Sequence, residues 1–124
     1  MPQVLIVEDD QSIAELLEFM MLREGHTVQI CRDGHAAQAR IVDGPVPALV
    51  IMDVMLPYKD GFELIALLRA QPAWAQVPVL MLSAKSQEPD IVRALDSGSS
   101  GYVVKPFQPQ ELMARVRQML AASA

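Results

Sequence analysis

Short runs of aliphatic residues recur along the chain, and longer stretches of mixed polarity separate them. Unbroken apolar runs of this kind are typical of strands that are buried on both faces of a parallel sheet. We therefore predict five strands, at residues 3–7, 27–30, 48–52, 77–82 and 101–104.

The stretches between these runs place apolar residues at helical spacing. In the clearest case, residues 11–24, Ser12 is expected to cap the helix and Gly25 to end it. The core-facing side of this helix is predicted to be complete with Ile13, Leu16, Leu17, Met20 and Met21, and Phe19 and Leu22 lie outside it. Further helices are expected at residues 34–43, 61–70, 88–97 and 109–120, the last one beginning at Pro109.

The regular alternation of strand and helix predicts the α/β fold class. Right-handed crossovers then place helices on both faces of a parallel sheet. For five strands, we expect a flavodoxin-like (βα)5 doubly wound sheet with strand order 2-1-3-4-5. The 124 residues fit a single domain, residues 1–124, and the 52% hydrophobic content is sufficient for one core.

Charge and cysteine content narrow the possible functions. The formal net charge of -5 argues against direct binding of nucleic acid, which requires clustered lysine and arginine. The single cysteine, Cys31, lies in an apolar stretch and is expected to be a buried thiol in a reducing compartment. No apolar run approaches membrane-spanning length, and no signal peptide is recognisable. We expect a cytoplasmic protein that does not contact membranes.

Polar residues follow four of the predicted strands at the point where each strand ends. Glu8 and Asp9 follow the first strand, Asp53 ends the third, Ser83 the fourth and Lys105 the fifth. Because the carboxyl ends of parallel strands meet at one edge of a sheet, these side chains are predicted to form one site. Neighbouring strands lie about 5 Å apart, so Asp9 and Asp53 are expected to face each other.

Three adjacent carboxylates, Glu8, Asp9 and Asp10, repel one another unless a positive charge joins them. Oxygen ligands of this kind suit Mg²⁺, with Lys105 as a second, fixed positive charge. A carboxylate beside a metal ion and an ammonium group is placed to accept a phosphoryl group. Asp10, one residue further on, is expected to cap the first helix rather than to bind metal.

The sequence resembles the receiver domain of two-component response regulators over essentially its whole length. The resemblance rests on "VEDD" after the first strand, "MDVMLPYKDG" around Asp53, "LSAK" after the fourth strand and "GYVVKPF" at the fifth. It implies that Asp53 is the phosphoacceptor. It also implies that Asp9, Asp53 and the backbone carbonyl of Met55 bind Mg²⁺ directly, and that Glu8 supports the metal through water.

The resemblance further assigns a switch and a phosphoryl-binding lysine. Ser83 is similar to the hydroxyl residue that moves to the phosphoryl group, and Tyr102 to the aromatic residue that then turns inward. Lys105 is similar to the lysine that contacts the phosphoryl group and, before it arrives, the carboxylate. The Lys105–Pro106 bond is expected to be cis, because receiver domains share this feature.

A receiver domain is a signalling domain rather than an enzyme, although it assists its own phosphorylation and dephosphorylation. The implied partners are a histidine kinase or phosphotransfer protein, and an output domain or protein at the face of helix 88–97, strand 101–104 and helix 109–120. Related winged-helix regulators dimerise there through ion pairs, but this chain has Ile91, Ser100 and Gly101 at the charged positions. Glu111 and Arg115 thereby lose their expected partners, so we do not expect the ionic dimer.

Three other functions are weaker interpretations of the same pattern. A dehalogenase-type phosphohydrolase needs a second aspartate two residues after the first, where this chain has Met55. A flavodoxin needs a phosphate loop rich in Ser and Thr, where this chain has Glu8, Asp9 and Asp10. The chain could also be an unphosphorylated binding module on the same scaffold, but that interpretation does not explain why all of the site residues are present.

Overall fold

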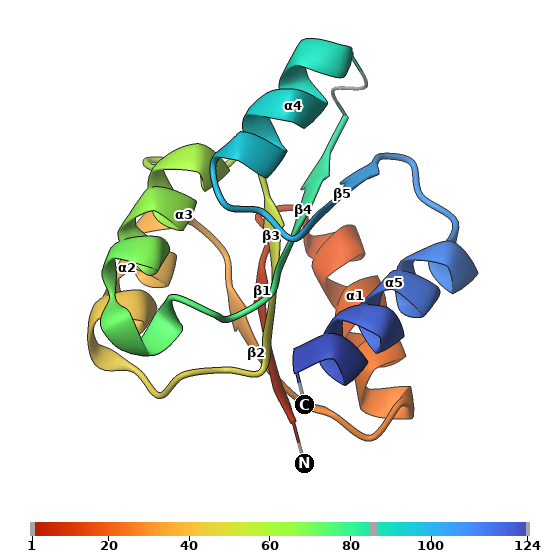
Figure 1. The fold of residues 1–124 in the computed structure, drawn as a ribbon. Helices are drawn as coiled ribbons and strands as arrows, with labels where there is room; N and C mark the ends of the chain where they lie inside the picture. The colour runs from red at the N-terminus through yellow and green to blue at the C-terminus, as the bar shows by residue number, and fades with distance from the viewer. Residues whose placement is uncertain (1, 85–86, 124) are drawn as a thin grey trace.

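The computed structural model describes residues 2–84 and 87–123. Its five strands form one parallel sheet in the order β2-β1-β3-β4-β5 (Figure 1). The predicted fold class and strand order are therefore confirmed. The strands are β1 (Gln3–Val7), β2 (Thr27–Cys31), β3 (Leu49–Asp53), β4 (Val79–Ser83) and β5 (Gly101–Val104).

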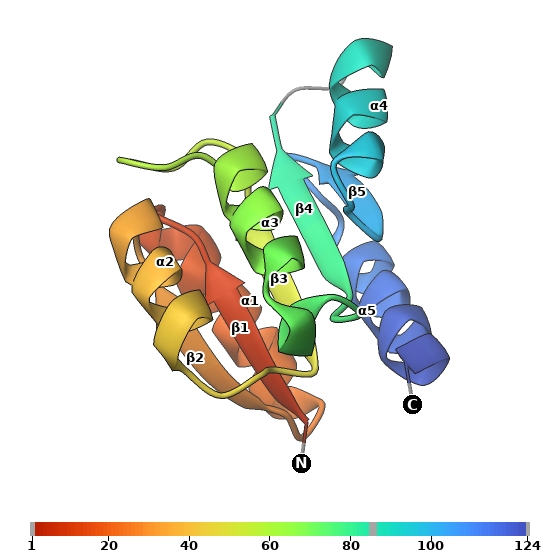
Figure 2. The same ribbon diagram turned by 60° about the vertical axis from the view of Figure 1, so that its left-hand side comes forward.

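Helices cover both faces of the sheet. One face carries α1 and α5 and the other carries α2 and α3, while α4 lies at the edge beside β5 (Figures 1 and 2). Within the described part of the chain, no helix is both long enough and apolar enough to cross a lipid bilayer. The helices are α1 (Gln11–Arg23), α2 (Gly34–Asp43), α3 (Gly61–Ala70), α4 (Glu88–Asp96) and α5 (Pro109–Ser123), with a 3-10 turn η1 (Pro72–Trp74).

The three central strands, β1, β3 and β4, are mostly apolar because both of their faces are buried, whereas the edge strand β2 is partly exposed. In β1, Leu5 and Val7 pack on the side of α2 and α3, whereas Val4 and Ile6 pack on the side of α1 and α5. All four side chains are inaccessible to solvent. Most positions of the central strands therefore require an apolar side chain, which explains why their apolar runs are continuous rather than alternating.

The start of α1 differs from one prediction and agrees with another. Asp10 caps the helix, and its carboxylate accepts a hydrogen bond of 3.0 Å from the backbone N–H of Ile13. Ser12 was the wrong choice of cap, because it lies inside the helix. Asp10 has the extended backbone conformation that lets a side-chain oxygen reach the first turn.

The buried side of α1 is also narrower than predicted. Leu17, Met20 and Met21 are buried as expected, but Leu16 is 40% exposed and Ala14 is buried in its place. The helix thus turns the small Ala14 side chain toward the sheet, which leaves Leu16 on the flank. Exposure of Phe19 and Leu22 agrees with their predicted positions, because both side chains are more than half exposed.

Two residues of α3 and η1 fix the opposite end of the sheet from the polar strand ends. The guanidinium of Arg69 donates hydrogen bonds to the carbonyls of Trp74, Ala75 and Val77, and to that of Gly98 just before β5. Trp74 is buried in the core. These contacts tie α3 to the segments that lead into β4 and β5.

Candidate functional site

The carboxyl ends of β1, β3, β4 and β5 lie at the same edge of the sheet, which is the upper edge in Figure 2. Asp53 is the last residue of β3 and Ser83 the last of β4, while Glu8 and Lys105 follow β1 and β5. The predicted site residues therefore share one edge.

Three carboxylates converge at this edge. Glu8, Asp9 and Asp53 each present an oxygen atom, and these oxygens lie within 4.8 Å of one another. Glu8 is completely buried and Asp53 is 4% exposed, whereas Asp9 is exposed to solvent. Solvent therefore reaches the cluster at Asp9, whereas Glu8 and Asp53 are covered by the protein.

Lys105 supplies a positive charge to two of these carboxylates. Its Nζ lies 2.5 Å from Oδ2 of Asp53 and 2.9 Å from Oε1 of Glu8. Burial by itself lowers the pKa of Lys105, but the hydrogen bonds to Asp53 and Glu8 outweigh it, so the net pKa is raised. The contact with Asp53 was expected, whereas the equally direct contact with Glu8 was not.

Glu8 is the carboxylate with the most perturbed protonation. Its burial, together with the nearby Asp53 carboxylate, raises its pKa to about 7 from an ordinary value of 4.5, and the Lys105 hydrogen bond offsets only part of that rise. The remaining oxygen, Oε2, accepts a hydrogen bond of 3.2 Å from the backbone N–H of Asp10. In the metal-free protein, Glu8 therefore holds its proton at a pH where exposed carboxylates are ionised.

This raised pKa makes stability depend on pH. The pKa of Glu8 is higher in the folded than in the unfolded state. Protonation of Glu8 therefore adds to the free energy of unfolding; this addition is complete below pH 4.5 and is lost as pH rises through about 7. Between pH 5 and pH 8, the free energy of unfolding of the metal-free wild type should fall by about 2 kcal/mol more than that of Glu8→Gln, which lacks the titrating group. Urea unfolding in a chelator at both pH values measures this difference. Equal pH dependence in the variant and the wild type would contradict the raised pKa.

Asp53 is held at both of its oxygens. Oδ1 accepts a hydrogen bond of 3.0 Å from the backbone N–H of Met55, and Oδ2 contacts Lys105. The Met55 side chain is exposed, and an open cleft of about 390 Å³ lies between Asp9 and the loop of residues 55–60. Space for a small ion or an incoming group is thus present next to the held carboxylate.

The donor set fits a hard divalent cation. The three carboxylates of Glu8, Asp9 and Asp53 offer only oxygen, and neither histidine nor cysteine belongs to the cluster. Oxygen-only ligands with an open side suit ions such as Mg²⁺ or Mn²⁺ rather than softer metals. The residues present are therefore compatible with the predicted metal.

The two predicted switch residues lie on neighbouring strands. Ser83 is fully buried and pairs in register with Val104, while Tyr102 pairs with Met81. Partners in a parallel ladder and residues two apart point to the same face, so Ser83 and Tyr102 share the sheet face that α3 covers. The Tyr102 ring is half-buried and packs against the core cluster on this face. The Lys105–Pro106 bond beyond them is cis, as the resemblance implied.

Comparison with known proteins agrees with this geometry. Residues 4–117 match the family model described as the response regulator receiver domain. The phosphate regulon transcriptional regulatory protein PhoB of Rhizobium meliloti is 40% identical over 120 residues, which cover 97% of this chain and 52% of that protein. This chain spans about half the length of the curated relatives it matches.

Solved structures show the same likeness. The receiver domain of the Francisella response regulator 1452 superimposes with a TM-score of 0.91 at 31% identity, with both chains fully covered. The receiver domain of the sensor histidine kinase PA1611 from Pseudomonas aeruginosa PAO1, which has a magnesium ion in its active site cleft, gives a TM-score of 0.87 at 28% identity. That match covers 97% of this chain and 98% of the other. Together with the family match, these likenesses show that the chain belongs to the response regulator receiver domain family.

Proposed function

We propose that this receiver domain accepts a phosphoryl group on Asp53 from the phosphohistidine of a histidine kinase or phosphotransfer protein. An Asp53 oxygen would attack phosphorus while the bond between phosphorus and the imidazole nitrogen breaks, and the leaving imidazole takes up a proton. The observation that carries the proposal is the Asp53 carboxylate, which is nearly buried, oriented at both oxygens and in contact with Lys105. Acceptor and cation are thus arranged before any donor arrives.

The proposed metal is Mg²⁺, held by Asp9, Asp53 and the Met55 carbonyl, with Glu8 acting through water. A bound divalent cation would offset negative charge on the transferred phosphoryl group. The carboxylate cluster and its oxygen-only donor set support this assignment, as does the magnesium in the related PA1611 receiver. Lys105 would exchange part of its contact with Asp53 for a phosphoryl oxygen, and the Ser83 hydroxyl would donate to another.

The direct test is phosphorylation by a small acyl phosphate in the presence of Mg²⁺ without any kinase. Intact mass should rise by one phosphoryl group, because the site itself provides acceptor and lysine. A mass that stays unchanged with a donor of verified reactivity would favour the unphosphorylated binding module. We place the exchange in the cytoplasm, which the buried, unpaired thiol of Cys31 supports.

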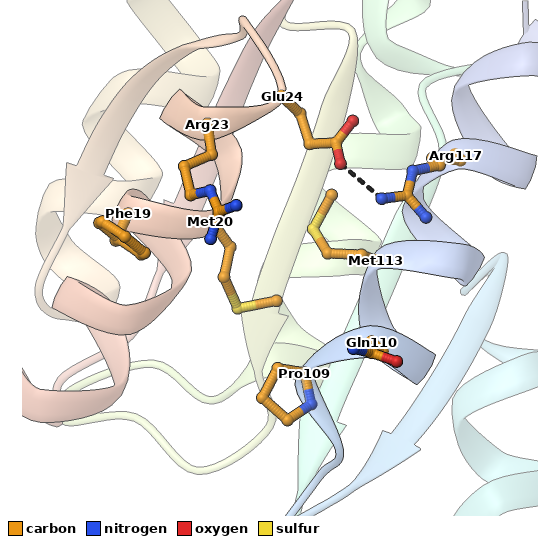
Figure 3. A pocket seen from close by; sticks show the side chains of 8 residues that line it. All are labelled: Phe19, Met20, Arg23, Glu24, Pro109, Gln110, Met113 and Arg117. Atoms are coloured by element: carbon orange, nitrogen blue, oxygen red, sulfur yellow. Dashed lines mark hydrogen bonds and ion pairs between the residues drawn. The ribbon is translucent and has the colours of Figure 1, made fainter.

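The phosphohistidine partner is proposed to dock over α1. A cavity of about 320 Å³ lies between α1 and α5. Figure 3 shows its lining side chains, with Phe19 on the α1 side and Met20 and Met113 pointing toward the space between the two helices. The guanidinium of Arg23 lies 5.7 Å from the centre of the Phe19 ring. An exposed aromatic ring beside a positively charged groove is a suitable contact for a partner helix.

Phe19→Ala should slow transfer from a cognate phosphohistidine protein by about tenfold, since truncating an interface aromatic typically costs more than 1 kcal/mol. Phosphorylation by the small acyl phosphate should keep its rate, because Phe19 lies outside the carboxylate site. Leu22→Ala is the matched control: Leu22 is 54% exposed on the same helix but does not line the cavity. Equal slowing with both donors would remove the docking role from Phe19.

The proposed output surface is the face formed by α4, β5 and α5. Phosphorylation would draw the Ser83 hydroxyl inward and let Tyr102 fill the space, which biases an existing equilibrium. On this face, Glu111 and Arg115 pair with each other at 3.5 Å within α5, and both are exposed. Val92 and Leu95 of α4 are also exposed, so the surface offers apolar contacts to an output domain or partner protein.

We accordingly expect the beryllofluoride-treated protein not to form a salt-bridged dimer. Any self-association should change little between low and high salt, because apolar contacts are not screened whereas exposed ion pairs are. Sedimentation velocity at both salt concentrations measures this. A tight dimer that dissociates as salt rises would show that Glu111 and Arg115 pair across two copies instead.

A further inference from the structure

The loop after β3 contains a strained turn. Tyr58 has a φ of 73°, and the backbone N–H of Lys59 donates to the carbonyl of Pro57 at 2.9 Å, which closes a tight turn around Tyr58. A turn of this kind with a positive φ at a bulky residue is uncommon and strained. Tyr58 is 72% exposed, so burial of its side chain in the core does not stabilise the turn. Other contacts must hold it.

The start of α2 supplies those contacts. The backbone N–H of Gly34 donates to the same Pro57 carbonyl at 3.0 Å. The His35 ring stacks on the Tyr58 ring, with centroids 4.2 Å apart and planes 14° from parallel. A Cβ atom at Gly34 would lie only 2.5 Å from the backbone carbonyl oxygen of Lys59, so this close approach requires glycine.

The same short segment also contacts the loop after β1. A guanidinium nitrogen of Arg32 donates to the backbone carbonyl of Asp9 at 3.2 Å. Residues 32–35 therefore contact both loops that carry proposed metal ligands, through Asp9 on one side and Pro57 and Tyr58 on the other. Figure 2 shows the loop after β3 reaching over the start of α2. Residues 32–35 lie between the end of β2 and the start of α2, and none of these four residues belongs to the carboxylate cluster.

From these contacts we infer that residues 32–35 and Tyr58 position the divalent-cation site by holding the Asp9 and Met55 loops in place. This inference rests on the proposed function, because it concerns the affinity of the same metal site. The loop that carries Met55, residues 55–60, has two anchors. At one end Asp53 accepts a hydrogen bond from the Met55 N–H, and further along Gly34 bonds to Pro57 and His35 stacks on Tyr58. Without the second anchor, an exposed and strained loop occupies its binding conformation for less of the time. Metal affinity falls in proportion to that fraction.

The test is binding of Mn²⁺ to the intact chain, measured by electron paramagnetic resonance, which distinguishes free from bound ion. Tyr58→Ala removes the ring, and Gly34→Ala forces the Lys59 backbone away; each should weaken Mn²⁺ binding by about three- to tenfold. Tyr58→Phe keeps the stacked ring and should restore the affinity. Val42→Ala is the matched control, because Val42 is 57% exposed on α2 and lies at the end of that helix opposite Gly34 and His35.

Unfolding midpoints measured in a chelator separate positioning from general destabilisation. Tyr58→Ala should lose affinity while its metal-free midpoint stays close to that of the wild type, and the Tyr58 variants keep the test valid if Gly34→Ala does not fold. Wild-type affinity in Tyr58→Ala, or the same loss in Tyr58→Phe, would overturn the inference. Asp9→Ala tests the site itself: unchanged Mn²⁺ binding in that variant would instead overturn the proposed metal site.

Discussion

Asp53→Asn is expected to abolish phosphorylation by a small acyl phosphate, with a loss of at least about a hundredfold in rate. An amide cannot replace a carboxylate as nucleophile, and Asp53 is the buried carboxylate that Lys105 and the Met55 N–H both hold. The substitution is nearly isosteric. Lys105 also retains Glu8 as a partner at 2.9 Å, so the fold should be preserved. Intact mass after treatment with donor and Mg²⁺ gives the result directly.

Asp10→Asn is the matched control for this experiment. Asp10 is an acidic neighbour of the site, but its carboxylate caps α1, a role that asparagine fills equally well. The control should therefore gain the mass of one phosphoryl group like the wild type. A mass gain in Asp53→Asn equal to that of the wild type would show that another residue is the acceptor.

Removal of Mg²⁺ should abolish phosphorylation as completely as the Asp53→Asn substitution does, while leaving the fold intact. The carboxylate oxygens of Glu8, Asp9 and Asp53 lie within 4.8 Å of one another. Among the described residues, Lys105 is the cation that contacts them, and a bound metal ion would add the charge needed when a negatively charged donor approaches. The core is built from the apolar faces of the sheet, so the metal is not needed for folding. Intact mass with and without a chelator, beside circular dichroism of both samples, measures the two effects.

Asp9→Ala should block phosphorylation in the presence of Mg²⁺ and raise the stability of the metal-free protein modestly. Removing the exposed carboxylate relieves its repulsion with Asp53, an effect of about 1 kcal/mol at this partly solvated position. Urea midpoints in a chelator provide the comparison. A variant that is clearly less stable than the wild type would show that Asp9 is held by contacts stronger than the repulsion.

Much of the fold followed from local pattern because the three central strands, β1, β3 and β4, are buried on both faces. Apolar runs predicted all five strands to within two residues of their observed ends, and their alternation with helices predicted the order of the sheet. The shared position of Asp9, Asp53, Ser83 and Lys105 followed from the same topology, since parallel strands end at one edge. The resemblance to receiver domains then assigned roles that spacing alone does not provide.

Tertiary packing decided the details for which sequence carries little signal. Helical periodicity places Ala14 and Leu16 on opposite flanks of the α1 face that Leu17 shares, and only contact with the sheet determines that Ala14 is buried while Leu16 is exposed. Ser12 and Asp10 are both good capping residues. The choice between them depends on where the chain leaves its extended conformation after β1.

The contacts around the site depend on packing even more strongly. Lys105 reaches Glu8 as well as Asp53 because both carboxylates are buried at the depth of its ammonium group, a property that residue order does not reveal. His35 and Tyr58 are far apart in sequence, and their stacking depends on the close approach that Gly34 permits. The sequence by itself determined which strands exist and which residues end them. The tertiary structure decided which side chains meet there, because contact between distant segments depends on the offset and depth at which whole elements pack.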